Sequence, residues 1–388
     1  MRIKVGQAVR GEDFFNRDRE IKTLWAEIEA GSSILISAPR RVGKTSLMLY
    51  LHDNPRDGYY IVYIITESVS SENEFFKRLF DEIIETVLGN MDKFFRKTST
   101  AAKAISSKIK SIGQKGIEFD SDGGLNYFEE LKRVFISLDL NERLVIMVDE
   151  FAQTVENIVN SKGTDKAVHF LQSNRELRQS TEFNENVQFI YAGSIGLENI
   201  VSSLNAVNLI NDLNPVFIRP LSTEQAKMLI KELTKCLDFS LEEEKIGYVL
   251  DKIKWLIPFY IQLIVQELNR ITEQNGIGEI DEKLIDGAFN RILEQRNHFE
   301  HWNTRLRKAY KAEDYTFAVS ILNLISNEEE IDSNTIHDLA VKYKVEEHFK
   351  DIIRTLIYDG YINNNDDPQK YRFNSPILRM WWWKNVSN

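Results

Sequence analysis

Short apolar runs separated by polar and amphipathic stretches give the chain the pattern of an α/β protein. The run at 33–37 (SILIS) is short and continuous, which is typical of a buried strand in a parallel sheet. The stretch at 45–51 (TSLMLYL) is apolar almost throughout and ends near Asp53 and Pro55, which predicts a buried helix. A strand, a polar loop and a helix are therefore expected in this order.

The loop between this strand and this helix has the residue spacing of a phosphate-binding loop. The P-loop pattern is Gly, four residues, Gly, Lys and then Ser or Thr, and Ala38 stands at the first glycine position. This change removes none of the essential groups, which are backbone N–H groups around the phosphates, a lysine and a hydroxyl on Mg²⁺. We therefore predict that the loop binds ATP or ADP, with Lys44 as a catalytic residue and Thr45 as a ligand of Mg²⁺. The residues predicted to contact the nucleotide here are Pro39, Arg40, Arg41, Val42, Gly43, Lys44, Thr45 and Ser46.

A second apolar run, at 144–148, delivers two carboxylates at its C-terminal end. Ligands of open α/β sheets lie beyond the carboxyl ends of the strands, so Asp149 is expected beside the phosphates. We predict that Asp149 holds Mg²⁺ through water and that Glu150 orients or activates the attacking water. A solvated turn would explain the two carboxylates alone, but the phosphate-binding loop upstream disfavours it.

A third apolar run, at 187–193, ends in a small polar residue, Ser194. Its hydroxyl is suited to sensing the γ-phosphate, so Ser194 is a candidate catalytic residue. A plain strand followed by a glycine turn explains the same residues equally well, and both interpretations stay open.

Composition restricts the function classes that remain. The chain has 388 residues, of which 43% are hydrophobic and 28% charged, so it is long enough for two or three domains. The longest apolar runs, such as 59–65, are too short to cross a membrane, and no signal-peptide apolar segment stands near the N-terminus. A cytoplasmic protein is therefore expected. The single cysteine, Cys236, excludes a disulfide framework, and the net charge of -10 disfavours a surface that binds nucleic acid throughout.

Five segments together resemble the archaeal-type P-loop ATPases of the STAND/AAA+ lineage, which are related to the origin-recognition ATPases. These segments are FFNRDREIKTL, APRRVGKTSL, LVIMVDEF, AGSIGL and YRFNSPILRMWW. The resemblance implies an AAA+-like α/β core whose parallel sheet has five strands, at about 33–37, 60–65, 144–149, 187–193 and 215–219. It also implies that Phe15 and Arg17 lie in a segment that approaches the adenine. GTP is disfavoured because the sequence has no Asn-Lys-x-Asp box for guanine.

Three domains are expected: a P-loop core at 1–220, a helical lid at 221–299 and a winged helix at 300–388. In the lid, Ser222 and Gln225 have the spacing of a capping box that opens an amphipathic helix. Ser240 and Glu243 have the same spacing and predict a second such helix start.

Pro258 is a further candidate contact of the nucleotide, by resemblance alone. The STAND relatives have a Gly-x-Pro motif at this place, and here Leu256 occupies the glycine position. A proline at the first position of a helix explains Pro258 equally well.

The third predicted domain has helical patterns at 313–326, 333–343 and 346–358, followed by two short β runs around a polar turn. From His301 to Asn388 the sequence has 12 Lys and Arg against 13 Asp and Glu. Faces that bind DNA concentrate positive charge, so a protein partner is the better prediction for this winged helix.

One segment is strongly basic. Residues 93–117 contain seven Lys and Arg and no acidic residue, between helices expected at 72–88 and 125–138. A solvated excursion of the ATPase core is the simpler interpretation, and contact with an anionic partner such as nucleic acid is the functional one.

We predict an ATP-binding molecular switch with slow, Mg²⁺-dependent hydrolysis, whose lid and winged helix change conformation with the nucleotide to engage a partner. One alternative is a nucleotide-gated DNA-binding regulator, which the acidic balance disfavours. Another is a scaffold that holds ADP without turnover, which Glu150 disfavours. The oligomeric state stays open. No arginine occurs between Arg178 and Arg219, so Arg175 and Arg178 are the remaining candidates for an arginine finger.

Overall fold

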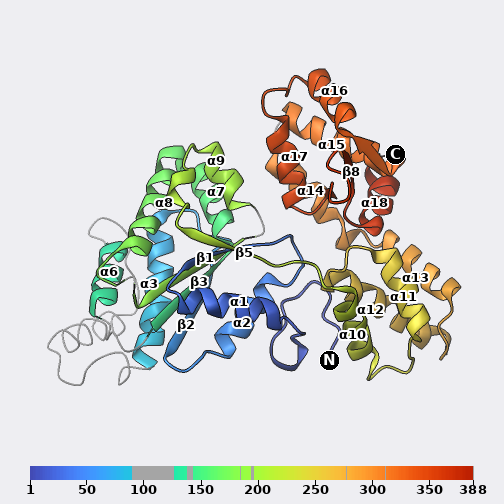
Figure 1. Cartoon of the computed structure of the whole chain (residues 1–388), viewed down its shortest axis with the longest axis horizontal. Helices are drawn as coiled ribbons and strands as arrows, with labels where there is room; N and C mark the ends of the chain where they lie inside the picture. Colours follow the sequence, from blue (N-terminus) through green and yellow to red (C-terminus); the bar gives the residue numbers. More distant parts are fainter. Residues whose placement is uncertain are drawn as a thin grey trace. The chain divides into compact units, whose positions relative to one another are not determined.

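The computed structural model describes residues 1–89, 126–137, 143–183, 185–193, 196–276, 278–310 and 312–387 (Figure 1). Its contacts divide the chain into two units. Unit 1 comprises Met1–Asn16, Pro39–Gly43 and Arg219–Asn388, and unit 2 comprises Arg17–Ala38 and Lys44–Ile218. The domain boundaries expected at 220 and 299 stay predictions.

A parallel five-stranded sheet lies at the centre of unit 2, with the strand order β2-β3-β4-β1-β5 (Figure 1). The strands are β1 (Ser33–Ser37), β2 (Tyr59–Ile65), β3 (Arg143–Asp149), β4 (Val187–Ala192) and β5 (Leu213–Phe217). The predicted α/β fold with five parallel strands is therefore confirmed, and the strand ends differ from the expected ones by at most two residues.

Helices cover both faces of this sheet because its strands are apolar on both sides. They are α1 (Asp18–Glu29), α2 (Lys44–Asp53), α3 (Glu72–Gly89), α6 (Tyr127–Ser137), α7 (Phe151–Lys162), α8 (Thr164–Gln179) and α9 (Leu197–Ser203). One buried cluster joins alternate strand residues such as Ile146 and Phe189 to Phe75 of α3 and Phe170 of α8. Helices α1 and α2 contact β1, β2 and β5. This arrangement leaves the carboxyl ends of the strands as the place where polar side chains gather.

Unit 1 is mainly helical. Its elements are α10 (Thr223–Thr234), α11 (Glu243–Ile253), α12 (Pro258–Asn275), α13 (Glu282–Glu294), α14 (Glu300–Ala309), α15 (Ala312–Glu328), β6 (Glu330–Asp332), α16 (Ser333–Tyr343), α17 (Phe349–Tyr358), β7 (Ile362–Asn363), β8 (Lys370–Phe373) and α18 (Pro376–Trp382). The last three strands form an antiparallel sheet in the order β6-β8-β7. The helical region expected from 222 is confirmed. Among the residues that the structure describes, no helix is long and apolar enough to cross a membrane.

The two capping boxes predicted in this unit have different outcomes. Ser222 accepts a hydrogen bond from the backbone N–H of Gln225, and the Gln225 side chain accepts one from the N–H of Ser222, so the first box is confirmed. The second prediction is wrong, because α11 begins at Glu243 with Glu242 as its N-cap. The Glu243 carboxylate instead lies 2.9 Å from Lys227 Nζ and 2.7 Å from Lys231 Nζ on α10. Two cations on the neighbouring helix replace the reciprocal cap.

Arg178, a candidate arginine finger, is a structural residue of unit 2. Its guanidinium donates to both carboxylate oxygens of Asp212, at 2.7 and 2.9 Å, and to the carbonyl of Leu209 at 2.7 Å. The side chain is only 2% exposed and also lies over the Tyr191 ring. A guanidinium used in this way is not presented to a neighbouring subunit.

We predict that Arg178→Ala lowers the free energy of unfolding of unit 2 by about 3 kcal/mol, because it leaves the Asp212 carboxylate partly buried without its partner. Urea denaturation followed by circular dichroism measures the change. The matched control is Arg175→Ala, since Arg175 is half-exposed and makes an exposed hydrogen bond to Gln179 one turn away, and a change within about 0.5 kcal/mol is expected. An unchanged stability for Arg178→Ala, together with loss of a concentration-dependent ATPase rate, would restore Arg178 as an arginine finger.

Candidate functional site

The loop between β1 and α2 is shaped by two residues with positive φ. Arg41 has a φ of 63° and Gly43 a φ of 103°, a value that glycine adopts without steric cost. Helix α2 begins directly after Gly43, at Lys44. The first N–H groups of a helix have no partner within the helix, so this turn presents donors to an anion.

Lys44 and Thr45 are the first two residues of α2 in unit 2, and their side chains have different hydrogen-bond partners. The Lys44 Nζ donates to the carbonyl of Ala38 at 3.1 Å, and the residue is 6% exposed. The Thr45 hydroxyl donates to Asp149 Oδ2 at 2.8 Å, across 104 positions of sequence. The sheet thus brings together the two residues that the sequence predicts as ligands of Mg²⁺.

Asp149 is almost completely enclosed at the end of β3. It is 2% exposed, and its carboxylate accepts hydrogen bonds from Thr45, from the Tyr63 hydroxyl at 3.1 Å and from the backbone N–H of Glu150 at 3.0 Å. Burial raises the pKa of Asp149, whereas the hydrogen bond from Thr45 and the nearby Lys44 cation act in the opposite direction. Tyr63 has no motif around it in the sequence, and only the fold reveals it.

The oxygen donors of Thr45 and Asp149 fit Mg²⁺, which takes oxygen ligands and is usually held by one or two carboxylates, waters and substrate phosphates. In the described part of the chain, no group of three or more His, Cys, Asp or Glu residues could hold a metal ion by itself. A single carboxylate beside a hydroxyl is the donor set expected for a metal that arrives with a nucleotide.

Glu150 is placed by an unusual backbone conformation. Its φ of 59° and ψ of 32° are left-handed, and the residue is the N-cap of α7. This turn separates the two adjacent carboxylates, so that Asp149 is buried and Glu150 is half-exposed. Left-handed backbone costs a non-glycine residue about 1–2 kcal/mol, so the surrounding structure must hold Glu150 there. Ser194, the candidate sensor, lies outside the described residues.

The Arg41 side chain is engaged within unit 1. Its guanidinium lies 3.8 Å from the centroid of the Phe259 ring, and its Nη2 lies 3.3 Å from Nδ1 of His301. Burial, and then the nearby Arg41 cation, lower the pKa of His301 to about 3, so the neutral ring can accept a hydrogen bond from Arg41. Sequence reasoning missed Phe259 and His301, which belong to no motif.

The remaining candidates have varied surroundings. Phe15 is half-buried in unit 1. Arg17 precedes α1 in unit 2, is 3% exposed and forms a 3.0 Å ion pair with Glu20. Pro258 is the first residue of α12, after its N-cap Ile257, so the helix-start interpretation is confirmed. Contact of these residues with a nucleotide stays a prediction.

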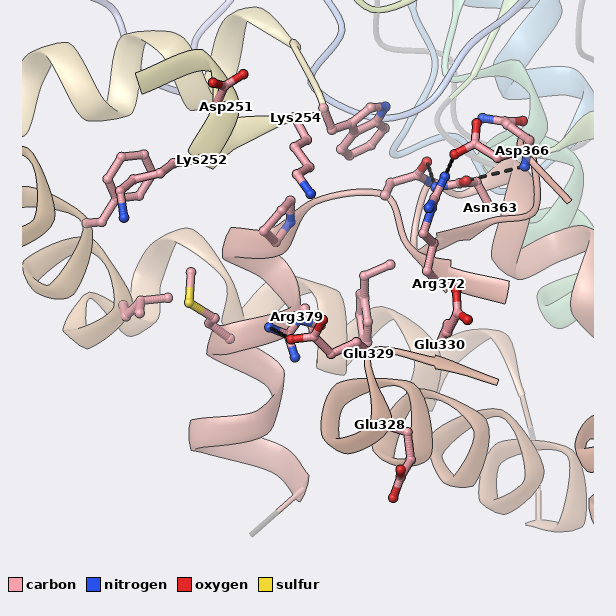
Figure 2. Close-up of a pocket in the computed structure, with 18 of the residues that line it drawn as sticks. Asp251, Lys252, Lys254, Glu328, Glu329, Glu330, Asn363, Asp366, Arg372 and Arg379 are labelled. Carbon is pink, nitrogen blue, oxygen red and sulfur yellow. Dashed lines mark hydrogen bonds and ion pairs between the residues drawn. The ribbon is translucent and has the colours of Figure 1, made fainter. Parts of the chain in front are cut away.

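A cavity of about 1050 Å³ lies within unit 1 (Figure 2). Its lining comes from α11, α13, the small sheet and α18, and includes no predicted site residue. Several of its charged side chains are paired: Lys252 lies 2.7 Å from Asp286, and Arg379 lies 2.9 Å from Glu329. None of the residues predicted to bind the nucleotide lines this cavity.

Comparison with protein families decides the lineage. A family described as an ATPase domain predominantly from Archaea matches residues 14–253, which include the loop, Asp149 and Glu150. The chain belongs to this family. It is an archaeal-type ATPase domain protein, as the sequence resemblance implied. Comparison with curated proteins finds no match.

Solved structures extend the likeness beyond the matched residues. The Walker-type ATPase of Pyrococcus abyssi shares 18% identity with this ATPase at a TM-score of 0.66, over 98% of this chain and 99% of that one. The ORC2 protein of Aeropyrum pernix, solved in ADPNP and ADP complexes, shares 11% identity at a TM-score of 0.54, over 97% of this chain and 95% of that one. Both likenesses are of fold alone.

We predict that Glu150→Gly raises the free energy of unfolding by about 0.5–1 kcal/mol relative to Glu150→Gln. Both variants lose the carboxylate, but only glycine relieves the left-handed strain, and the greater freedom of glycine in the unfolded chain offsets part of the gain. Chemical denaturation of the two variants side by side gives the difference. A glycine variant less stable than the glutamine variant would show that Glu150 carries no strain.

Proposed function

We propose that this archaeal-type ATPase binds ATP with Mg²⁺ and hydrolyses it slowly, as a molecular switch. The observation that carries the proposal is the 2.8 Å contact between Thr45 Oγ1 and Asp149 Oδ2, because it joins the two halves of a metal-nucleotide site. The phosphate-binding turn before α2 and the half-exposed Glu150 beside Asp149 support the same function.

The side chains divide the work by their positions. Lys44 and the N–H groups at the start of α2 bind the phosphates, and Lys44 leaves the carbonyl of Ala38 to do so. Thr45 and Asp149 would hold Mg²⁺, which neutralises developing charge on the phosphates when it is bound. Glu150 orients the attacking water and accepts its proton. The turn at the end of β3 fixes the backbone of Glu150 directly beside Asp149.

The C-terminal elements of unit 1 support a winged helix as the output of the switch. Helix α15, strand β6, helices α16 and α17 and strands β7 and β8 follow one another in the order of that fold. The exposed residues around the start of α17 include three acids, Glu346, Glu347 and Asp351, opposed by Lys350 and Arg354, and Arg354 is paired with Asp351 at 2.7 Å. This acidic face favours a protein partner over nucleic acid.

Lys44→Ala should abolish nucleotide binding, whereas Glu150→Gln should keep ATP bound and stop its hydrolysis. The lysine contacts phosphates in the ground state, and the glutamate serves only the attacking water. Titration with fluorescent ATP and a phosphate-release assay separate the two effects. Equal ATP affinity for the wild type and Lys44→Ala would refute the phosphate-binding assignment.

Nucleic-acid binding, if the wild type shows it at low salt, should depend on the basic segment at 93–117, which lies outside the described residues. Replacing Lys103, Lys108 and Lys110 with Glu should then remove binding and its salt dependence, because phosphate contacts by clustered cations dominate such affinity. Replacing Lys350 and Arg354 is the matched control and should leave binding nearly intact. The reverse pattern, measured by fluorescence anisotropy at several salt concentrations, would make α17 the DNA-reading element.

A further inference from the structure

We propose that Tyr63 is a positioning residue of the Mg²⁺-nucleotide site, acting through Asp149. The inference rests on the proposed function and adds a residue that no motif of the loop or of β3 contains. The Tyr63 hydroxyl lies 3.1 Å from Asp149 Oδ2, the same oxygen that accepts from Thr45 at 2.8 Å. A carboxylate oxygen with two donors in fixed directions has little freedom to rotate, so the phenol and the threonine together set where Asp149 points.

The register of the sheet explains how Tyr63 reaches this carboxylate. Strands β2 and β3 are parallel neighbours, with Ile65 opposite Asp149 and Tyr63 opposite Met147. Residues two apart along a strand share a face, so Tyr63 lies on the same face as Asp149 and one step behind it. The long phenol spans that step and reaches the carboxylate from the side of β2. Ile65, directly opposite, has no polar group to offer.

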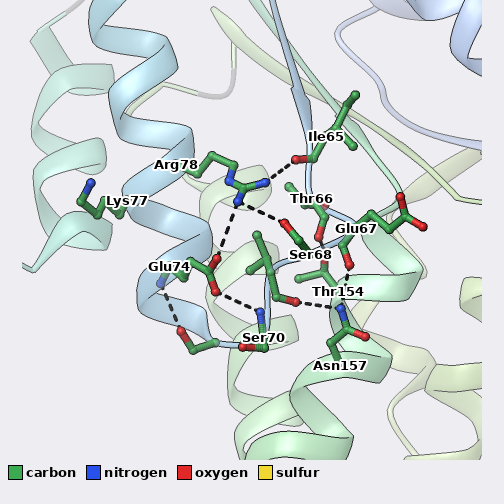
Figure 3. Close-up of polar contacts among 12 residues, drawn as sticks. Ile65, Thr66, Glu67, Ser68, Ser70, Glu74, Lys77, Arg78, Thr154 and Asn157 are labelled. Carbon is green, nitrogen blue, oxygen red and sulfur yellow. Dashed lines mark hydrogen bonds and ion pairs between the residues drawn. The ribbon is translucent and has the colours of Figure 1, made fainter.

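A polar network fixes the end of β2 against α7 (Figure 3) and also against β3. The Thr66 backbone N–H and hydroxyl both donate to the carbonyl of Asp149, each at 3.0 Å. The Thr154 hydroxyl donates to the carbonyl of Thr66 at 2.7 Å, and Asn157 Nδ2 donates to the carbonyl of Glu67 at 2.8 Å (Figure 3). Tyr63 therefore belongs to a strand whose end is hydrogen-bonded to the backbone of Asp149. This attachment maintains the 3.1 Å distance between the Tyr63 hydroxyl and Asp149 Oδ2.

Helix α3 completes this attachment. Arg78 donates to the carbonyl of Ile65 at 2.8 Å and to the Ser68 hydroxyl at 3.3 Å, and it forms an ion pair with Glu74 at 3.6 Å (Figure 3). Most of these contacts go to main-chain carbonyls, and the Tyr63 hydroxyl donates to Asp149 Oδ2. A phenol needed only for packing would have no reason to place its oxygen on the one carboxylate that serves the metal.

The test compares wild type with Tyr63→Phe, which removes one oxygen and keeps the ring. Fluorescent ADP is titrated in EDTA and then at increasing Mg²⁺ concentrations. Partners that orient metal ligands typically change metal affinity by 10- to 100-fold, so we expect the half-saturating Mg²⁺ concentration to rise about tenfold. ADP affinity in EDTA should stay within twofold of the wild type, because the phosphate-binding loop itself is unchanged.

Two further variants separate positioning from a general structural effect. Tyr248→Phe is the matched control, because the Tyr248 hydroxyl also donates to a carboxylate, Asp286 Oδ1 at 2.9 Å, within unit 1. It should leave both readouts unchanged. In an Asp149→Asn background, Tyr63→Phe should add little to the Mg²⁺ requirement, because a residue that acts through Asp149 is not additive with it.

Equal Mg²⁺ requirements for wild type and Tyr63→Phe would overturn the proposal. So would an equal loss of ADP affinity in EDTA and in Mg²⁺, since that result indicates a structural role only. A wild type whose ADP affinity is independent of Mg²⁺ would refute the metal site itself, and with it both the proposed function and this inference. The wild-type titration therefore distinguishes failure of the function from failure of the role of Tyr63.

Discussion

The hydrogen bond between Thr45 and Asp149 is the constraint on which the site depends. It joins the first turn of α2 to the end of β3, although β4 lies between β3 and β1 in the sheet. Burying a carboxylate is costly unless it accepts hydrogen bonds, and Asp149 is 2% exposed. The hydroxyls of Thr45 and Tyr63 and the N–H of Glu150 offset that cost. The same donors that make the buried charge tolerable therefore also fix its direction.

Two adjacent carboxylates acquire different chemistry because the backbone turns between them. Asp149 ends a strand and points into the interior, while Glu150 adopts a left-handed conformation and begins α7 half-exposed. Burial raises the pKa of Asp149, and its neighbour Glu150 adds to that effect. A metal-binding group has to be fixed, and a group that serves water has to reach solvent. The left-handed backbone of Glu150 alone meets both requirements, at a cost in backbone strain.

The sequence predicted the site residues that directly follow buried strands, because the ends of parallel strands form the functional edge of such a sheet. The apolar runs at 33–37 and 144–148 indicated buried strands, and the glycine-lysine turn after the first and the carboxylates after the second indicated the functional edge. It could not predict Tyr63, Phe259 or His301, whose importance comes from partners far away in the chain. Strand order was also beyond it, since parallel strands of similar composition can be arranged in several ways. Ser240 failed as a cap because tertiary ion pairs to Glu243 outweighed a local pattern.

The hydrogen-bond partners of Arg178 and Lys44 distinguish a structural cation from one that is proposed to bind phosphate. Its guanidinium donates to Asp212 and to a carbonyl and lies over the ring of Tyr191, so moving it would leave the partly buried Asp212 carboxylate without its partner. Lys44 is buried to a similar degree, and its Nζ donates to the neutral carbonyl of Ala38 while lying near the Asp149 carboxylate. An anion competes readily with a carbonyl for a cation, but poorly with a carboxylate held at two points. The partner, rather than the burial, therefore distinguishes the structural Arg178 from Lys44, to which the proposed function assigns the phosphates.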